Sequence, residues 1–291
     1  MANPGFLYYN QYMQKKRFFR LLFPVFLMLA ASSVFAQSGG LRIVLETNAT
    51  GLTIVSSSGS ANILVIPDTI DDRPITQIGD NAFIGKGLLE VTIPDSVTII
   101  GDGAFSFNRL TTVVIGNNVT SIGRGAFTGN RLTNVTLGSS VATIGKGAFS
   151  ENKIDAIELP NTVTVIDDYA FFSNRIRSIE LPASLTLIGE GAFSGNRLSA
   201  IVLGNNVVTV RDGAFYNNNL TSVTIPASLQ DLGSRAFDAR VQDGRIRGNI
   251  VYTDTGGNIL HTTANNFDAY YASNGNRPGR YTLVEGRWRI E

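Results

Sequence analysis

The chain has no cysteine and a single histidine, His261. The missing thiols exclude a disulfide framework, a thiolate metal site and a lipid-anchored cysteine. His261 has no serine and carboxylate pattern around it, so we expect a surface residue rather than a catalytic one. Metal-ligand spacing is also missing, and we interpret the acidic cluster Asp68, Asp71 and Asp72 as a solvated turn rather than a calcium loop. The sequence therefore predicts no catalytic residue, no cofactor and no metal site.

Long hydrophobic runs are restricted to the N-terminus. Residues 1–36 contain a basic segment (Lys15, Lys16, Arg17, Arg20), an apolar run over 21–31 and small residues at Val34 and Ala36. This order is typical of a secretory signal peptide cut before Gln37, and the apolar run is too short for a membrane span. Whether translation starts at Met1 or Met13 stays open. We expect a secreted or cell-surface protein with no transmembrane span after cleavage.

A charge excess of one sign is missing as well. Removing residues 1–36 takes away four positive charges and no negative ones, so the net charge changes from +1 to −3. A mature chain this close to neutral has no global field that would attract nucleic acid or anionic lipid. We therefore expect no nucleic-acid partner.

A strict repeat dominates the rest of the chain. A phenylalanine preceded by alanine recurs every 22 residues, at Phe83, Phe105, Phe127, Phe149, Phe171, Phe193, Phe215 and Phe237. Repeats of this length form solenoids, in which each coil buries its apolar side on its neighbours. We predict a solenoid of about eight coils over residues 62–240. Solenoids present long surfaces, so macromolecule binding is the default expectation.

Three further columns predict how each coil is built. Aliphatic residues at plus eight and plus ten from each Phe, such as Val135 and Leu137, predict a parallel β-sheet on one face, on the order of 40 Å long. A second, shorter strand is expected at plus fourteen to seventeen, as at Val141 and Ile144. The G-x-x-A-F segment is expected to close each coil as a tight helical or 3₁₀ turn.

Two polar or small columns have structural interpretations. An Asn follows the Phe by three residues in six repeats, and a buried amide there can satisfy unpaired backbone donors and acceptors. A glycine column (Gly79, Gly101, Gly123, Gly145, Gly189, Gly233) suggests a backbone position with positive φ. Asp167 and Arg211 interrupt that column, and Arg211 is expected to mark local strain.

The string L-x-x-[VI]-x-[IL]-[PG]-x-[SNT]-[VL]-x-x-[IVL]-G-x-x-A-F resembles the BspA-like leucine-rich repeats of bacterial cell-surface antigens. The likeness covers residues 62–240, and the segment from Val65 to Ile75 is similar to the first repeat of that family. The chain departs from many members by having Asn where they carry Cys. The resemblance implies an exported surface protein linked to adhesion, matrix-protein binding or cell contact, and it implies no particular ligand.

The two ends lack the repeat. Residues 37–61 are interpreted as a β-rich N-terminal cap, and residues 241–291 as a β-rich C-terminal cap or an attachment region. Tyr281 to Val284 and Trp288 to Ile290, separated by a Glu-Gly turn, predict a terminal hairpin. Covering the exposed end strand is one role for this tail, and attachment or secretion is the other.

A basic side chain directly follows the Asn in five consecutive repeats, and we name this set the basic ridge: Arg109, Arg131, Lys153, Arg175 and Arg197. Packing requires no positive charge there. Like charges about 5 Å apart repel one another, and salt screens this repulsion only in part. Either the long stems cover the loop edge and pair with acids such as Asp155, or the ridge binds an anionic or acidic partner. Outward residues of the predicted sheet are the second candidate surface: Thr136, Glu158, Glu180 and Thr224.

Three functions follow in order of preference. The first is a non-enzymatic surface protein that binds a protein or other macromolecule, such as a host matrix protein, in adhesion. The second is a structural component that assembles with copies of itself in the cell envelope. The third is a carbohydrate-active enzyme, because stacked Glu158 and Glu180 would lie about 5 Å apart, the spacing of a retaining glycosidase. Their small neighbours, Ala156 and Ser178, offer no aromatic platform for a sugar.

Overall fold

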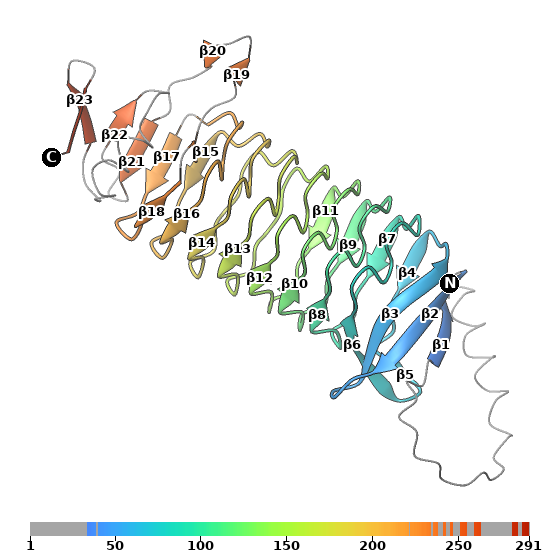
Figure 1. Cartoon of the computed structure of the whole chain (residues 1–291). Helices are drawn as coiled ribbons and strands as arrows, with labels where there is room; N and C mark the ends of the chain where they lie inside the picture. Colours follow the sequence, from blue (N-terminus) through green and yellow to red (C-terminus); the bar gives the residue numbers. More distant parts are fainter. Residues whose placement is uncertain are drawn as a thin grey trace, which may run out of the picture.

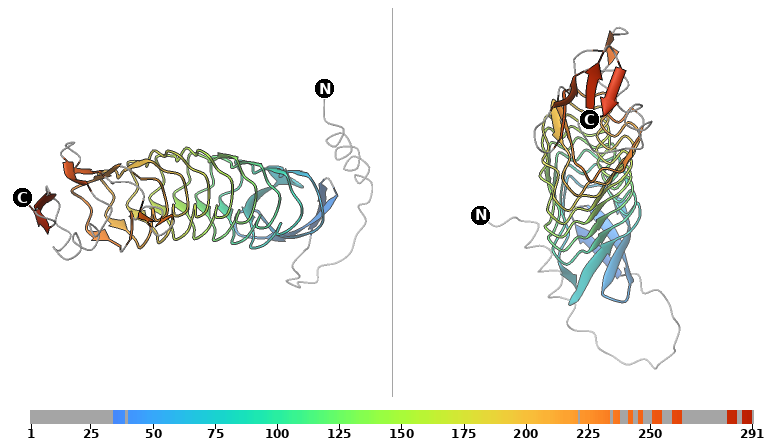
Figure 2. Two further views of the ribbon diagram at one scale, coloured as in Figure 1. Left: turned by 90° about the horizontal axis from the view of Figure 1, so that it is seen from above. Right: turned by 90° about the vertical axis from the view of Figure 1, so that its left-hand side faces the viewer.

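The structure, a computed structural model, describes the backbone at residues 34–38, 40–220, 222–233 and 235–237 and in six strands beyond. Its side chains are described over 40–220, 223–233 and 235–237. Figure 1 shows an elongated stack of coils that runs from the blue N-terminal strands to the orange C-terminal ones, and Figure 2 shows the same stack from above and end-on. The predicted solenoid of 22-residue coils with a parallel sheet is confirmed.

The second, shorter strands form the continuous sheet of the molecule. Strands 22 residues apart pair in parallel, so that Ile122 lies between Ile100 and Ile144. Two antiparallel pairs at the N-terminus continue the same sheet beyond the coils, and β5 (Thr69–Ile70) pairs with β6. The order is β1 (Val34–Ser38), β2 (Leu41–Thr47), β3 (Leu52–Gly59), β6 (Arg73–Ile78), β8 (Ile99–Ile100), β10 (Ser121–Ile122), β12 (Thr143–Ile144), β13 (Val165–Ile166), β14 (Leu187–Ile188), β16 (Thr209–Val210) and β18 (Asp231–Leu232).

The opposite sheet is interrupted, so the prediction of one unbroken sheet at plus eight to ten is wrong. One half contains β4 (Ile63–Val65), β7 (Glu90–Thr92), β9 (Thr112–Val114) and β11 (Asn134–Thr136). The other half contains β15 (Ala200–Val202), β17 (Ser222–Ile225), β21 (Val251–Asp254) and β22 (Ile259–Thr262). The two coils without a strand carry Glu158 and Glu180 in the same column. Like charges on neighbouring in-register strands repel, which opposes pairing there.

The turns that close the coils are not helical, which corrects a second expectation. In segment 101–107 the amides of Ala104 and Ser106 donate to carbonyls three residues earlier. The amide of Phe105 between them donates instead to the carbonyl of Ala126 in the next coil. A helix needs consecutive bonds of the first kind, whereas here every second amide joins two coils. The turns therefore contribute to the stacking itself.

The phenylalanine column is the core of the solenoid. All eight rings are fully buried, together with the alanines that precede them. Neighbouring rings stack with centroids 5.2–5.6 Å apart and planes inclined by 3–13°. Offset parallel rings at this distance are a favourable arrangement. Each coil thus depends on the coils above and below it to bury its ring.

The glycine column has a different cause from the one expected. None of its six members has a positive φ. A Cβ on Gly123 would lie 2.6 Å from the carbonyl carbon of Gly101, and one on Gly233 would lie 2.2 Å from the amide nitrogen of Asp212. Close approach of successive backbones therefore excludes side chains. Arg211 likewise has no positive φ, so the expected strain there is wrong.

The ends of the chain are described only in part. The expected signal peptide lies outside the described residues up to residue 33, and its last three residues fall in β1, which pairs with β2. The two-residue turn at Asp71 and Asp72 joins β5 to β6, as expected of a turn. At the other end, β23 (Tyr281–Val284) and β24 (Arg287–Ile290) form the predicted hairpin. A shorter hairpin joins β19 (Val241–Gln242) and β20 (Arg245–Ile246).

Candidate functional site

Buried asparagines fix the loop edge that carries the basic ridge. The side-chain amide of Asn130 donates to the carbonyls of Phe105 and Phe127, at 3.0 Å each. Its carbonyl oxygen accepts from the amide of Leu110, also at 3.0 Å. The same bonds recur at every member of the column: Asn108, Asn152, Asn174, Asn196 and Asn218. The predicted structural role of this column is confirmed.

Each residue of the basic ridge forms a backbone hydrogen bond to the preceding coil, while its side chain extends into solvent. The amide of Arg131 donates to the carbonyl of Leu110 in the preceding coil, at 2.9 Å, and the other four ridge residues repeat this bond. All five ridge side chains are exposed. Because coils are spaced by about 5 Å, the ridge is a row of cations at that interval. The backbone is ordered before any partner binds.

The ridge side chains form no direct contact with acids in the described part of the chain. No ridge side chain forms an ion pair there. Asp155, the acid expected to pair with the ridge, lies 3.6 Å from the guanidinium of Arg177 instead. The alternative that pairs the ridge with Asp155 is not supported by an ion pair, whereas the packing of the long stems on the loop edge stays an expectation. The positive charge of the ridge faces solvent.

The second candidate surface is divided. Thr136 lies exposed on β11, and Thr224 lies half-buried on β17, in the other half of the broken sheet. Glu158 and Glu180 are exposed but lie between those halves, outside any strand. The four residues therefore share a column without sharing a sheet.

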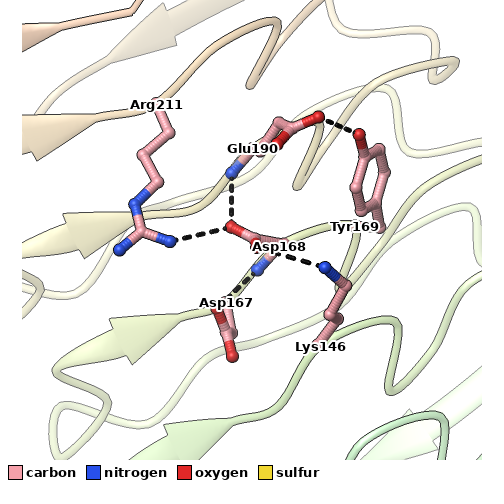
Figure 3. A network of polar contacts seen from close by, with 6 residues as sticks. All are labelled: Lys146, Asp167, Asp168, Tyr169, Glu190 and Arg211. Carbon is pink, nitrogen blue, oxygen red and sulfur yellow. Dashed lines mark hydrogen bonds and ion pairs between the residues drawn. The ribbon is translucent and has the colours of Figure 1, made fainter.

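A polar cluster around Asp168, before the phenylalanine of its coil, was not predicted from the sequence. Asp168 accepts hydrogen bonds from the amide of Glu190 at 2.9 Å and from the guanidinium of Arg211 at 3.0 Å, and it pairs with Lys146 at 3.4 Å. The hydroxyl of Tyr169 donates to the carboxylate of Glu190. Figure 3 shows that these contacts join successive coils.

The network shifts two pKa values in opposite directions. Partial burial would raise the pKa of Asp168, but the amide of Glu190 and the cations Arg211 and Lys146 together hold it below its usual 3.8. The hydrogen bond to Glu190, helped by burial and negative charge, raises the pKa of Tyr169 to about 12. Asp168 is thus ionised and Tyr169 protonated at neutral pH, which suits a clamp between coils.

The signal for this network was present as breaks in the repeat. Asp167 and Arg211 replace glycine in the close-approach column, and Tyr169 occupies a position held by glycine in five other coils. Tyr169 has a φ of 57° there, and its ring lies against the backbone of Gly191. When several residues in neighbouring coils depart from the repeat, the departures indicate a local network of side-chain contacts.

The described residues contain neither a metal site nor a membrane-spanning helix. No group of three or more His, Cys, Asp or Glu side chains within them could hold a metal ion. In the same part of the chain, no helix has the length and hydrophobicity required to cross a bilayer.

Comparisons with known proteins agree with the repeat pattern. The family described as "BspA type Leucine rich repeat region" matches six copies within residues 76–196 and 120–243. A search of the curated proteins found no match. Among solved structures, the chain is similar to a leucine rich cell surface protein from Faecalibacterium prausnitzii, at 23% identity over 72% of this chain and 77% of that one, with a TM-score of 0.40.

Two further solved structures are similar to the same degree. A leucine-rich repeat protein from Bacteroides ovatus has 20% identity over 73% of this chain and 77% of that one, with a TM-score of 0.43. The leucine-rich repeat protein of T. pallidum has 22% identity over 72% of this chain and 95% of that one, with a TM-score of 0.46.

Proposed function

Because the chain belongs to the BspA-type leucine-rich repeat family, we propose that it is a non-enzymatic protein of the cell surface that binds an acidic macromolecule through its basic ridge. Export follows from the signal peptide expected over residues 1–36. Binding in adhesion, for example to a host matrix protein, is the role that fits an exposed repeat surface.

The ridge is the observation that carries the proposal. It has five exposed cations in consecutive coils, none in an ion pair within the described residues, on a backbone fixed by coil-to-coil hydrogen bonds. Because the backbone that carries these charges is already fixed, it loses little conformational freedom when a partner binds. Since the mature chain has a net charge of −3, this positive charge is local and directs a partner to one edge.

The test uses protein from residue 37 onward and two variants of equal net charge. The ridge triple neutralises three central cations: Arg131→Gln, Lys153→Gln and Arg175→Gln. The control triple adds three acids at an exposed corner between the two sheets: Ser139→Glu, Asn161→Glu and Ala183→Glu. Each variant lowers the net charge by three. Surface charges contribute little to stability, so both should fold like wild type.

Each protein is used in a pull-down from host matrix proteins and envelope fractions at low and high salt. The proposal expects an acidic protein that is captured at low salt by wild type and the control triple, and lost with the ridge triple. Capture of the same proteins by wild type and both variants would contradict it. Recovery of only the chain itself would favour self-assembly in the envelope instead.

A further inference from the structure

Phe107 is an exposed aromatic residue in a strained backbone conformation. It is 64% exposed, and its φ of 55° lies in the left-handed region that bulky residues rarely adopt. The equivalent position in other coils also has a positive φ and is glycine at Gly85, Gly129 and Gly195. Glycine adopts this conformation without a steric penalty. Glu151, Ser173 and Asn217 also occupy this position, with φ of 55–59°, so the conformation belongs to the repeat and only its steric cost for a bulky ring is particular to Phe107.

Packing in the core does not explain the strain. The core ring of this coil is Phe105, which is fully buried two residues earlier. The ring of Phe107 touches the next coil, because a Cβ built on Gly129 would lie 2.7 Å from its Cδ1 atom. Most of the ring surface nevertheless stays in water. A strained residue whose side chain gains little from burial points to a role outside folding.

The ring lies beside the basic ridge. Phe107 is two residues before Arg109, and Gly129, which the ring touches, is two residues before Arg131. The ring therefore extends along the stack from the coil of one ridge cation to the coil of the next. Phenylalanine and arginine are both enriched at protein interfaces relative to the rest of the surface.

We propose that Phe107 is the apolar anchor of the ridge, and that the partner is an acidic protein segment with an apolar side chain next to its acidic residues. The inference rests on the proposed function of the ridge and adds the chemistry of its partner. A purely anionic polymer needs only the cations and gains nothing from an exposed ring. An apolar side chain on the partner would remove the ring from water, which is favourable.

Three probes separate these alternatives. The first is an acidic peptide with one leucine at its centre, the second is the same peptide with serine in place of leucine, and the third is heparin. Binding of each is measured at low salt with wild type, Phe107→Gly, the matched Ser173→Gly and Arg131→Gln. Ser173 occupies the same position two coils after Gly129 with a φ of 55°, so its variant relieves the same strain without removing a ring.

Wild type should bind the leucine peptide more tightly than the serine peptide. Phe107→Gly should weaken binding of the leucine peptide by about tenfold, because the leucine of the bound peptide would no longer be covered by the ring and would stay in water. Its binding of the serine peptide and of heparin should stay unchanged. Ser173→Gly should bind all three probes like wild type, and Arg131→Gln should weaken all three. Phe107→Gly should also unfold at a urea concentration no lower than wild type.

Failure of this inference is distinct from failure of the ridge. If wild type binds both peptides equally, or Phe107→Gly weakens both equally, Phe107 is not an anchor. If binding of heparin depends on Phe107 as strongly as binding of the leucine peptide does, the partner is a polysaccharide rather than a protein. Unfolding of Phe107→Gly at lower urea would give the ring a structural role and overturn the inference. If Arg131→Gln changes no probe, or wild type binds none, the proposed function itself is wrong.

Discussion

The replacement Asn152→Ala tests the buried hydrogen bonds that hold one coil to the next. The two N–H groups of the Asn152 amide are shared among the carbonyls of Phe127, Phe149 and Ser150, and its oxygen accepts from the amide of Leu132. The carbonyl of Ser150 also accepts from the amide of Gly129. The other two carbonyls keep another partner as well, because Asn130 also donates to Phe127 and Asn174 also donates to Phe149. The variant therefore leaves one buried donor, the amide of Leu132, without its side-chain partner.

The expected loss follows from that count. An orphaned buried donor costs about 1–3 kcal/mol, and each of two lost second bonds adds about 0.5–1 kcal/mol. We expect the free energy of unfolding to fall by about 2–5 kcal/mol in urea melts followed by circular dichroism. Asn134→Ala is the control, because Asn134 is exposed on β11 and its variant should stay within about 0.5 kcal/mol of wild type. Equal melts for the two variants would refute the structural role of the column.

Four other predictions concern the core, the broken sheet and the polar network. Phe149→Ala should lower the free energy of unfolding by about 3–5 kcal/mol, because it empties a buried aromatic site, and an unchanged urea melt would show that the ring is not in the core. Glu180→Thr should raise that free energy by about 0.2–1 kcal/mol by removing repulsion from Glu158, and a loss in the same urea melt would disprove repulsion as the cause of the break. Because the pKa of Asp168 is lowered by folding, its ionised form stabilises the fold above pH 3.8, and this stability is lost as the pH falls further. Melting temperatures of Asp168→Asn should depend less on acid pH than those of wild type, and parallel curves would contradict this. Because the pKa of Tyr169 is raised from 10.0 to about 12, its stabilising effect is lost as the pH rises through that interval. Tyr169→Phe should flatten the alkaline limb of the same melting curves, and an unchanged limb would oppose the raised pKa.

The regular part of the fold could be predicted because every coil repeats the same constraint. An unbroken column of eight phenylalanines has one explanation, a stacked core, and the structure agrees. The Asn column was predictable for the same reason, since a buried amide needs partners of both kinds. The glycine column was not, because a missing side chain is required both by positive φ and by close approach of two backbones. The absence of a positive φ in the column and the short distances at Gly123 and Gly233 decide between them.

The irregular part depends on contacts between coils, which one column cannot reveal. The bond between Arg211 and Asp168 joins residues 43 positions apart, and Tyr169 reaches Glu190 from the adjacent coil. Phe107 is an ordinary residue by sequence, and its exposed ring in contact with Gly129 distinguishes it from the other residues at its repeat position. The ridge was visible in the sequence as a column of basic residues. The sequence could not show that Asp155 pairs with Arg177 and not with a ridge residue.

The salt dependence of the association rate tests the ridge most directly. The acidic partner recovered in the pull-down is immobilised, and the rate is measured at about 0.1 M and about 1 M salt, where the Debye length is about 10 Å and about 3 Å. Wild type and the control triple should associate at least about tenfold faster at the lower salt, because the ridge steers the partner. The ridge triple should be slow at both salt concentrations. A ridge triple with the rate and salt dependence of wild type would contradict a binding role for this surface.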